Sequence, residues 1–494
     1  MIKNLVILGG GTAGWMAAAA FSQLFRHETL NIRLIESDEI GTIGVGESTI
    51  PAIRDFNRLL GIDEQEFIRE TKATLKLAIK FSDWGLIGQE YFHPFGQAGR
   101  DINAVDFHHY WLSLRNEADI AEFSRFSVAA EAAEQGRFSL PSQNNDFWSS
   151  TYSYAFHFDA GLYARYLRKY AEARSVKRIE GKYLSADRNS NTGDIVGLNL
   201  VSGERIEADF FIDATGFRAL LLSGVLQSPY ESWKEWLKCD SAIAIPCSTA
   251  KPFKAFTHAS AHSAGWRWRI PLQHRVGNGS VYSSDYMSKE NALDDLLANL
   301  EAEPLAEPRY LSFMPGMRQE QWINNCVGIG LSAGFLEPLE STSIYLIQYG
   351  IQKLIEYFPV SENFSLAQKE FNLQLTREFV RIRDFIIMHY AENQRDDSQF
   401  WQDCRNMSLP EGLAYRQAMF RGAGIVDPTQ YGLYASVCLG QNVIPEFYDA
   451  RVNAIPSPER KKILQEIKHE QEAFICRFPL LVDWLRGVGA VINE

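Results

Sequence analysis

Several features that would assign this 494-residue chain to a class at once are missing from it. No run reaches the roughly 18 uncharged apolar residues that a membrane-spanning helix requires. The first residues, Met1–Leu8, lack the basic region, apolar region and cleavage site that form a signal peptide in series. Internal repeats and low-complexity segments are also absent. We therefore expect a globular, cytoplasmic protein with no membrane span.

Positive charge is also in short supply. The chain has 49 basic and 61 acidic residues, which give a formal net charge of −12. This balance would repel nucleic-acid phosphates unless a strong local basic patch were present. The basic runs Arg165–Lys169 and Arg460–Lys462 are short and typical of solvated helix faces. The sequence predicts no nucleic-acid partner.

Cysteines are few. The six are scattered, with no CxxC pair and no histidine at metal-ligand spacing. This pattern is typical of reduced, buried thiols in a cytoplasmic protein. We expect neither a disulfide framework nor a metal site.

A glycine turn is the first informative feature that is present. The apolar run Ile2–Leu8 is typical of a strand in a parallel sheet, and it leads into a GxGxxG turn over residues 9–14. In such a turn, Gly9 turns the chain tightly, Gly11 lets the backbone approach a pyrophosphate, and Gly14 lets helix and strand pack closely. The N–H groups and dipole of the following helix favour the anion.

A second strand and an acidic residue follow this turn. The run Ile32–Ile35 is apolar and ends in Glu36, 22 residues after Gly14. An acid at this place accepts hydrogen bonds from a ribose diol. Strand, glycine turn, helix, strand and acid together predict a dinucleotide site, with a purely structural turn as the alternative.

FAD is favoured over NAD as the dinucleotide. The motif opens a long chain, and a glycine-rich segment, Gly41–Pro51, follows the acid and would pack along an extended cofactor. Far downstream, the apolar run Phe210–Asp213 leads into a second glycine turn at Ala214–Gly216. Split segments of this kind resemble the two-domain FAD monooxygenase fold, in which a substrate domain is threaded through the nucleotide domain.

The expected fold class is therefore α/β, with a Rossmann nucleotide-binding domain, an interleaved substrate domain and a mainly helical C-terminal part. We predict an FAD-binding body over residues 1–343, with mixed-sheet substrate regions at about 85–150 and 220–320. Residues 344–494 would form the helical part that completes the substrate pocket.

Local patterns predict the individual elements. Strands are expected over 182–215, around a turn at Asn189–Gly193, and over 240–285. Helices are expected over 52–80, 344–358, 362–395, 411–421 and 458–475.

Two motifs narrow the function. The segment Gly265–Pro271 contains WxWxIP, and alternation along a strand would send both tryptophans to one face. The segment Phe335–Ser343 reads FLEPLESTS, which places Glu340, Ser341 and Thr342 at a helix N-terminus able to bind a small anion. Taken alone, the first motif also fits core tryptophans, and the second also fits an ordinary acidic helix start.

Together these motifs resemble the flavin-dependent tryptophan halogenase family. The shared features are GxGxxG at the start, GVGES-IP after Glu36, WxWxIP in the middle and FLEPLEST late in the chain, in order from residue 2 to about residue 400. The pair WxWxIP and FxxPxxSxG is specific to that family among flavoproteins. The resemblance implies an FAD-dependent halogenase.

The resemblance also implies the catalytic residues. The family's essential lysine falls on Lys76 within Ala73–Phe81, and not on Lys80. Its essential glutamate falls on Glu340.

Binding roles are implied in the same way. The halide falls on the backbone amides of Thr342 and Ser343. Substrate contacts fall on His93, Phe95 and Ser341. The implied FAD-binding residues are Gly9, Gly11, Thr12, Ala13, Gly14, Glu36, Gly46, Ser48, Thr49, Gly216 and Gly330.

The implied reaction uses FAD supplied as FADH2, O2, and chloride or bromide to make hypohalous acid. Lys76 would hydrogen-bond this acid or form a haloamine, and Glu340 would stabilise the cationic arene intermediate and accept its proton. The chain has no second nucleotide motif, so a separate NAD(P)H-dependent flavin reductase is the expected partner. A flavin-dependent aromatic hydroxylase and a non-catalytic flavin-fold binding protein are the alternatives.

The sequence departs from the family pattern at two places. Ser343 stands where the motif has glycine, so a Cβ crowds the halide site. The region that clamps the amino-acid part in tryptophan-specific members is short here, at Gly422–Pro445, with Tyr431 and Tyr434 but no lysine or arginine. Without that clamp we expect free indole or a simple indole to be preferred over tryptophan.

Overall fold

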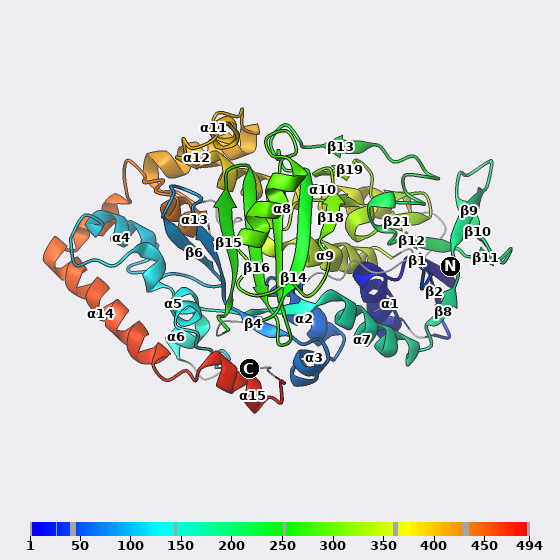
Figure 1. Ribbon diagram of the computed structural model, residues 1–494, viewed down its shortest axis with the longest axis horizontal. Helices are drawn as coiled ribbons and strands as arrows, with labels where there is room; N and C mark the ends of the chain where they lie inside the picture. Colours follow the sequence, from blue (N-terminus) through cyan, green and yellow to red (C-terminus); the bar gives the residue numbers. More distant parts are fainter. Residues whose placement is uncertain are drawn as a thin grey trace. The chain divides into compact units, whose positions relative to one another are not determined.

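The computed structural model describes residues 2–25, 27–39, 46–142, 146–249, 253–358, 364–426 and 434–491 (Figure 1). Backbone contacts divide the chain into two compact units. The first unit comprises Met1–Ala73, Phe158–Asp240 and Ser312–Arg383, and the second comprises Thr74–His157, Ser241–Leu311 and Asp384–Glu494. The interleaving in the predicted fold class is therefore confirmed, whereas the division of the chain at residues 343 and 344 stays a prediction.

A six-stranded sheet organises the first unit. In spatial order it contains β20 (Trp322–Ile323), β21 (Cys326–Gly328), β12 (Phe210–Asp213), β1 (Asn4–Leu8), β2 (Asn31–Glu36) and β8 (Lys177–Glu180). Strand β1 is parallel to β12 and β2, and Leu8 is in register with both Asp213 and Ile35. The chain therefore leaves these three strands at one carboxyl edge, where α/β sheets bind their ligands.

Helix α1 covers this sheet because its first turns are made of small and apolar residues. Residues 14–21 are fully or almost fully buried, and the helix contacts β1, β2, α7 and α9. The helices of the first unit are α1 (Thr12–Leu24), α2 (Ala52–Leu59), α3 (Glu64–Glu70), α7 (Ala160–Glu172) and α9 (Ser343–Glu356).

Smaller antiparallel sheets complete the first unit. The expected turn at Asn189–Gly193 joins β9 (Tyr183–Arg188) to β10 (Ile195–Leu200), and β11 (Arg205–Glu207) pairs with β10. A second small sheet has the order β13 (Tyr230–Ser232), β19 (Gly316–Arg318) and β22 (Gly334–Phe335), and β3 spans Gly46–Ser48.

A seven-stranded mixed sheet organises the second unit. In spatial order it contains β18 (Arg309–Ser312), β14 (Ser241–Cys247), β17 (Val276–Tyr282), β16 (Gly265–Pro271), β15 (Phe256–His262), β5 (Ala78–Ser82) and β6 (Glu90–Pro94). A separate antiparallel pair joins β4 (Thr74–Lys76) to β7 (Ala155–Asp159). The strands expected over 240–285 are confirmed.

Helices pack against this sheet and each other. Helix α8 (Lys289–Ala298) contacts β17, while α5 (Val128–Glu134) and α13 (Tyr434–Gly440) contact β6. Helix α14 (Ser457–Ile475), drawn orange-red in Figure 1, runs beside α4 (Phe107–Leu114) and α5. The other helices here are α6 (Phe147–Ser150), α11 (Gln399–Arg405), α12 (Glu411–Ala423) and α15 (Leu481–Gly487), while α10 (Ser365–Ala391) contributes to both units.

Two expectations are wrong. The helical stretch expected over 52–80 is divided into α2 and α3 and ends at Glu70, because Lys72 takes a left-handed φ of 53° and the chain continues as β4 and β5. Residues 74–79 are all buried, a burial pattern that suits strands within a core and not one face of a solvated helix. Cys476 is exposed, although the other five cysteines are buried and all six thiols are free.

Within the described ranges, no helix is long and apolar enough to cross a membrane. The four expected helices after residue 343 are confirmed as α9, α10, α12 and α14, with ends shifted by a few residues.

Candidate active site

The two glycine turns of the first unit touch each other. Gly9 has a φ of +113°, and a Cβ added there would lie 2.3 Å from the carbonyl oxygen of Ala214. A Cβ on Gly14 would lie 1.9 Å from the carbonyl oxygen of Gly9. Strand β1, helix α1 and the end of β12 therefore approach so closely that only glycine fits at both positions.

Gly11 differs from these two glycines because nothing fills the space beside it. It is the N-cap of α1, with an extended backbone, and a Cβ added there would meet no atom within 4 Å. Thr12 and Ala13 begin the helix, whose first N–H groups have no intrahelical acceptor. This open cradle at a helix start fits a dinucleotide pyrophosphate.

Glu36 ends β2 at the same edge of the sheet and is held by neighbours that the motif did not reveal. Its carboxylate accepts hydrogen bonds from Arg178 Nε at 2.6 Å and from Trp15 Nε1 at 3.3 Å, and it pairs with Arg168 at 3.5 Å. A carboxylate offers about four lone-pair positions and these neighbours occupy three, so about one remains for the ribose diol. Arg178 lies on β8, and no sequence signal links it to Glu36.

Asp213, at the end of β12, organises the second glycine turn. The buried Oδ1 accepts hydrogen bonds from the N–H and hydroxyl of Thr215 and from the hydroxyl of Ser332. Oδ2 accepts the N–H groups of Leu221 and Leu222 at 2.8 and 2.9 Å. Gly216 and the turn that starts at Gly330 are thereby tied together, and the Ser332 hydroxyl oxygen also lies 3.3 Å from the carbonyl oxygen of Gly216. Sequence reasoning used Asp213 only as a strand end.

The FLEPLESTS segment folds into a strained turn before α9. Glu340 and Ser341 have φ values of 66° and 61°, a region that costs non-glycine residues of order 1–3 kcal/mol each. Both side chains are buried, α9 begins at Ser343, and Thr342 is its N-cap. The Ser341 hydroxyl donates to the Ser48 hydroxyl at 3.0 Å, so the structure brings together two residues predicted for the site.

The short strand β3 carries a carboxyl group that sequence reasoning passed over. Glu47 lies between Gly46 and Ser48, and the next residue, Thr49, is buried. Burial, with a smaller effect from the negative charge of Asp159, raises the pKa of Glu47 to about 7. The preceding residues 40–45, which hold the start of the predicted glycine-rich segment, lie outside the described residues.

The predicted lysine and two of the three predicted substrate residues, His93 and Phe95, lie in the second unit. Lys76 on β4 has no exposed surface, and its Nζ lies 4.9 Å from the ring centroid of Phe95. His93 is also buried and packs edge-on against Phe385 at 5.5 Å. Lys80 pairs with Glu90 at 2.7 Å, and the choice of Lys76 as the directing lysine stays a prediction.

The tryptophans of WxWxIP share one face of β16, as alternation predicted. Trp266 and Trp268 are both buried, with ring centroids 6.2 Å apart, and Trp266 lies 6.3 Å from Trp84. Arg267 and Arg269, which alternate with them, pair with acidic residues. The tryptophans are thus part of the second unit's core.

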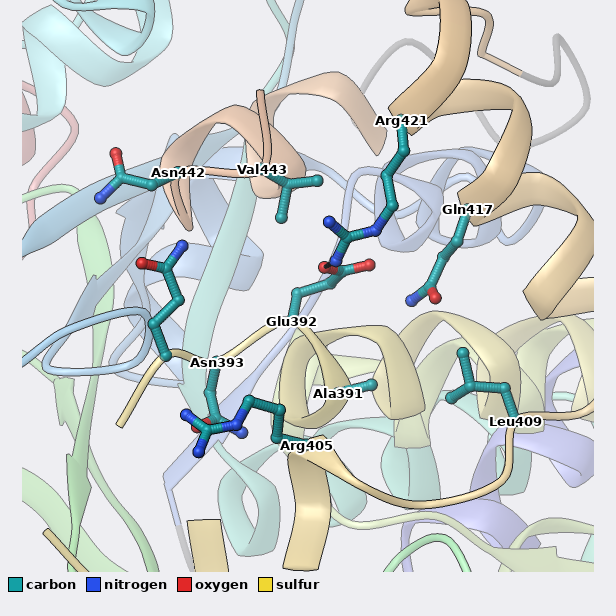
Figure 2. Close-up of a pocket in the computed structure, with 10 residues that line it drawn as sticks. Ala391, Glu392, Asn393, Arg405, Leu409, Gln417, Arg421, Asn442 and Val443 are labelled. Carbon is teal, nitrogen blue, oxygen red and sulfur yellow. Dashed lines mark hydrogen bonds and ion pairs between the residues drawn. The ribbon is translucent and has the colours of Figure 1, made fainter. Parts of the chain in front are cut away.

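Figure 2 shows a cavity of about 260 Å³ within the second unit, lined by the end of α10 and by α11, α12 and the turn after α13. Glu392 and Arg421 form an ion pair there. Arg421 immediately precedes the short segment Gly422–Pro445, in which Tyr434 is buried while residues 427–433, with Tyr431, lie outside the described residues. None of the predicted site residues lines this cavity.

The structure thus distributes the predicted residues over both units. The cofactor residues, Glu340, Ser341, Thr342 and Ser343 belong to the first, and Lys76, His93 and Phe95 belong to the second. Within the described part of the chain, no group of three or more acidic, histidine or cysteine side chains could hold a metal ion.

A parallel sheet whose two glycine turns and acidic strand end share one carboxyl edge defines the Rossmann-type class of FAD-binding flavoproteins. The family described as "Tryptophan halogenase" matches residues 4–457 of the chain. The chain therefore belongs to the tryptophan halogenase family, and it is a flavin-dependent halogenase.

Individual relatives agree with this assignment. The 7-chloro-L-tryptophan 6-halogenase KtzR of Kutzneria sp. (strain 744) is 34% identical, over 88% of this chain and 89% of that protein. Tryptophan 7-halogenase RebH of Lentzea aerocolonigenes is 30% identical over 98% of both chains. The solved structure of Xcc4156, a flavin-dependent halogenase from Xanthomonas campestris, is 42% identical with a TM-score of 0.95, over 99% of this chain and 98% of that chain. BrvH, a flavin-dependent halogenase from Brevundimonas sp. BAL3, is 41% identical with a TM-score of 0.95, over 99% of both chains.

The open space beside Gly11 generates a test of the cofactor cradle. Gly11→Val should fold with a melting temperature within a few degrees of wild type, because a Cβ at this position meets no protein atom within 4 Å. FAD affinity should fall at least about tenfold, since the branched side chain takes the place of a phosphate. Calorimetric titration with FAD and a thermal melt measure the two quantities. Gly14→Ala is the matched control and should instead destabilise the fold, and unchanged FAD affinity of Gly11→Val would place the pyrophosphate elsewhere.

The raised pKa of Glu47 generates a second test. Between its ordinary value of 4.5 and about 7, the folded protein holds a proton that the unfolded chain has lost, so stability falls as the pH rises through this window. Glu47→Gln should raise the melting temperature by a few degrees at pH 8 and leave it unchanged at pH 4. Scanning calorimetry at both pH values checks this, with the exposed Glu235→Gln as control. An equal shift at both pH values would contradict the titration.

Proposed function

We propose that this halogenase uses reduced FAD, O2 and chloride or bromide to halogenate an indole-type arene, and that Lys76 directs the reactive halogen. The observation that most directly supports this proposal is the complete burial of Lys76 beside Phe95. Membership of the tryptophan halogenase family supports the reaction class. A separate flavin reductase supplies the reduced cofactor in this proposal.

The cofactor residues of the first unit hold the FAD in this proposal. Gly9, Gly11 and Gly14 with the start of α1 bind the pyrophosphate, and Glu36 accepts the ribose hydroxyls. The other contacts come from Thr12, Ala13, Gly46, Ser48, Thr49, Gly216 and Gly330. When bound in its reduced form, FAD supplies the two electrons with which O2 and a halide ion yield hypohalous acid and water.

Lys76 controls where the hypohalous acid reacts. A lysine on the surface is hydrated and does not differ from the other surface lysines. A buried ammonium has lost its water shell and can hold a bound hypohalous acid in one place. Hydrogen bonding from the Nζ ammonium makes the halogen electrophilic at that point only. The alternative is a haloamine, formed when Nζ gives up its proton and takes the halogen from hypohalous acid while water leaves. Glu340 is held buried by a strained turn, where its carboxylate stabilises the arene cation and takes the proton that leaves the ring.

The halide binds at the start of α9. The backbone amides of Thr342 and Ser343 lie in the first turn of the helix, where N–H groups lack intrahelical acceptors and the dipole favours an anion. Thr342 is buried, so water competes weakly for an ion beside it.

The substrate in this proposal is free indole or a simple indole, and the residues expected to contact it are His93, Phe95 and Ser341. A zwitterion needs partners for both of its charges, and leaving them unpaired costs several kcal/mol. The short segment Gly422–Pro445 contains no lysine or arginine, and the preceding Arg421 is already engaged by Glu392. A loosely held indole then reacts where its own electron density is highest, at C3.

Lys76→Ala tests the proposal directly. Halogenated product should fall at least about a hundredfold while reduced flavin is still oxidised and hypohalous acid is still released, because only its direction is lost. Glu340→Gln should slow product formation while FAD affinity holds. Product is measured by mass spectrometry and hypohalous acid with a chemical trap. Lys80→Ala is the matched control and should keep its product yield, and undiminished product from Lys76→Ala would sink the mechanism.

Ser343→Gly tests the halide placement. Removing the Cβ should change the halide concentration needed for half-maximal rate by a few-fold and should not abolish turnover, because the backbone N–H remains. Halide titrations with chloride and with bromide measure it. Loss of product at unchanged halide affinity would count against the site.

Competition between equal concentrations of indole and tryptophan tests the substrate. Indole should be consumed first and carry the halogen at C3, since the segment Gly422–Pro445 has no lysine or arginine to pair with the carboxylate of tryptophan. If tryptophan wins and is halogenated on its six-membered ring, the indole assignment is wrong. In that case Arg421→Gln shows whether the Glu392–Arg421 pair holds the amino-acid part.

A further inference from the structure

The residue two positions before Lys76 anchors its strand to the end of the WxWxIP motif. Thr74 is fully buried on β4, and alternation puts its side chain on the same face as that of Lys76. The Thr74 hydroxyl donates to the carbonyl oxygen of Pro271 at 2.6 Å. Pro271 is the last residue of β16, so the motif's end is bonded to the short strand that carries the lysine.

A buried histidine completes this anchor. His157 is the register partner of Thr74 across β4 and β7, and its Nδ1 lies 3.1 Å from the Thr74 hydroxyl oxygen. Its Nε2 lies 2.9 Å from the hydroxyl of Thr257 on β15. The side chain of His157 therefore links β4 and β15 from its own strand, β7.

Counting protons assigns the roles in this network. A hydroxyl has one proton, and that of Thr74 goes to Pro271, so its oxygen accepts from His157. The proton of the imidazole therefore sits on Nδ1, and Nε2 accepts from Thr257. Burial, followed by the positive charges of Lys76 and Arg269, lowers the pKa of His157 well below its ordinary value, which keeps the ring neutral.

We propose that Thr74 and His157 are positioning residues that hold β4, and with it the Lys76 ammonium, at one place beside Phe95. This inference rests on the proposed role of Lys76. A lysine side chain has many rotamers, so its Nζ is placed only if the backbone beneath it is fixed. The strand β4 is only three residues long, Thr74–Lys76. Two polar groups outside it, the Pro271 carbonyl and the His157 ring, bond its Thr74 hydroxyl, and Thr257 holds the other side of that ring. In this proposal the last residue of WxWxIP helps to position Lys76 through the Pro271 carbonyl, whereas the two tryptophans of the motif belong to the core.

The direct test is Thr74→Val, which keeps the shape of the side chain and removes its hydroxyl. The Pro271 carbonyl and the His157 Nδ1–H then lose their shared partner. The fraction of oxidised flavin that appears as halogenated indole should fall about ten- to a hundredfold, the cost of a misplacement near 1 Å. Hypohalous acid caught by a chemical trap should stay at the wild-type rate. Thr74→Ser restores the hydroxyl and should return the product fraction to within about twofold of wild type.

A spectroscopic measurement tests the network apart from turnover. ¹⁵N spectra of histidine-labelled protein should show the Nδ1–H tautomer for His157, whose signal is identified by its loss in His157→Asn. The Asn variant keeps an N–H near the Nδ1 position and should retain more product than His157→Phe. An Nε2–H tautomer in wild type would overturn the assignment.

The outcomes separate this inference from the proposed function. If Lys76→Ala keeps its product, the proposed function fails whatever Thr74 does. If Lys76→Ala loses product but Thr74→Val does not, only the positioning role is overturned. Equal losses of product and trapped hypohalous acid in Thr74→Val would indicate a general defect and would also overturn it.

Discussion

The burial of a lysine ammonium is the constraint on which the arrangement of the second unit depends. Moving such a charge out of water costs several kcal/mol unless neighbours compensate. The Phe95 ring offers its face to the Lys76 ammonium, and His157 stays neutral and adds no second positive charge. Directly after the lysine, the backbone bonds other segments. The Leu77 N–H donates to the carbonyl of Ala255, and the Leu77 carbonyl accepts from the Phe95 N–H. Backbone hydrogen bonds therefore hold the chain both at Lys76, which pairs with Ala155 on β7, and at the residue after it.

The first unit depends on a different constraint, the approach of three backbone segments to contact distance. Gly9, Gly14 and Ala214 meet so closely that positions 9 and 14 have no room for a Cβ, and Asp213 then fixes the loops that leave the same edge. This leaves an open cradle at Gly11, although the surrounding structure is packed. The two constraints have complementary chemical results. The close backbone contacts of the first unit leave space for the anionic pyrophosphate at Gly11, and the packing of the second unit keeps the Lys76 cation away from water.

Many of the strands and helices were predictable from the sequence because they depend on the spacing of apolar residues and glycines over short stretches. The strands β1, β12 and β16 and the helices after residue 343 lie where periodicity and glycine turns placed them. The expected helix over 52–80 failed because residues 74–79 are buried by strands distant in sequence, and burial on every side erases the periodicity that separates a helix from a strand. The partners of Glu36 also escaped notice, since Arg178 approaches from another strand.

The sequence by itself determined the cofactor class and the family, and it predicts where the catalytic and binding residues lie, because each depends on residue types at short, fixed spacing. Only the tertiary structure decided that Lys76 lies on a strand with no exposed surface, that Glu340 sits in a left-handed turn, and that Thr74 and His157 bond each other 83 residues apart. Burial and hydrogen bonding between distant segments are set by the whole packing of the chain. No local stretch of sequence contains that information, since the free energy that selects it is shared among residues that meet only after folding.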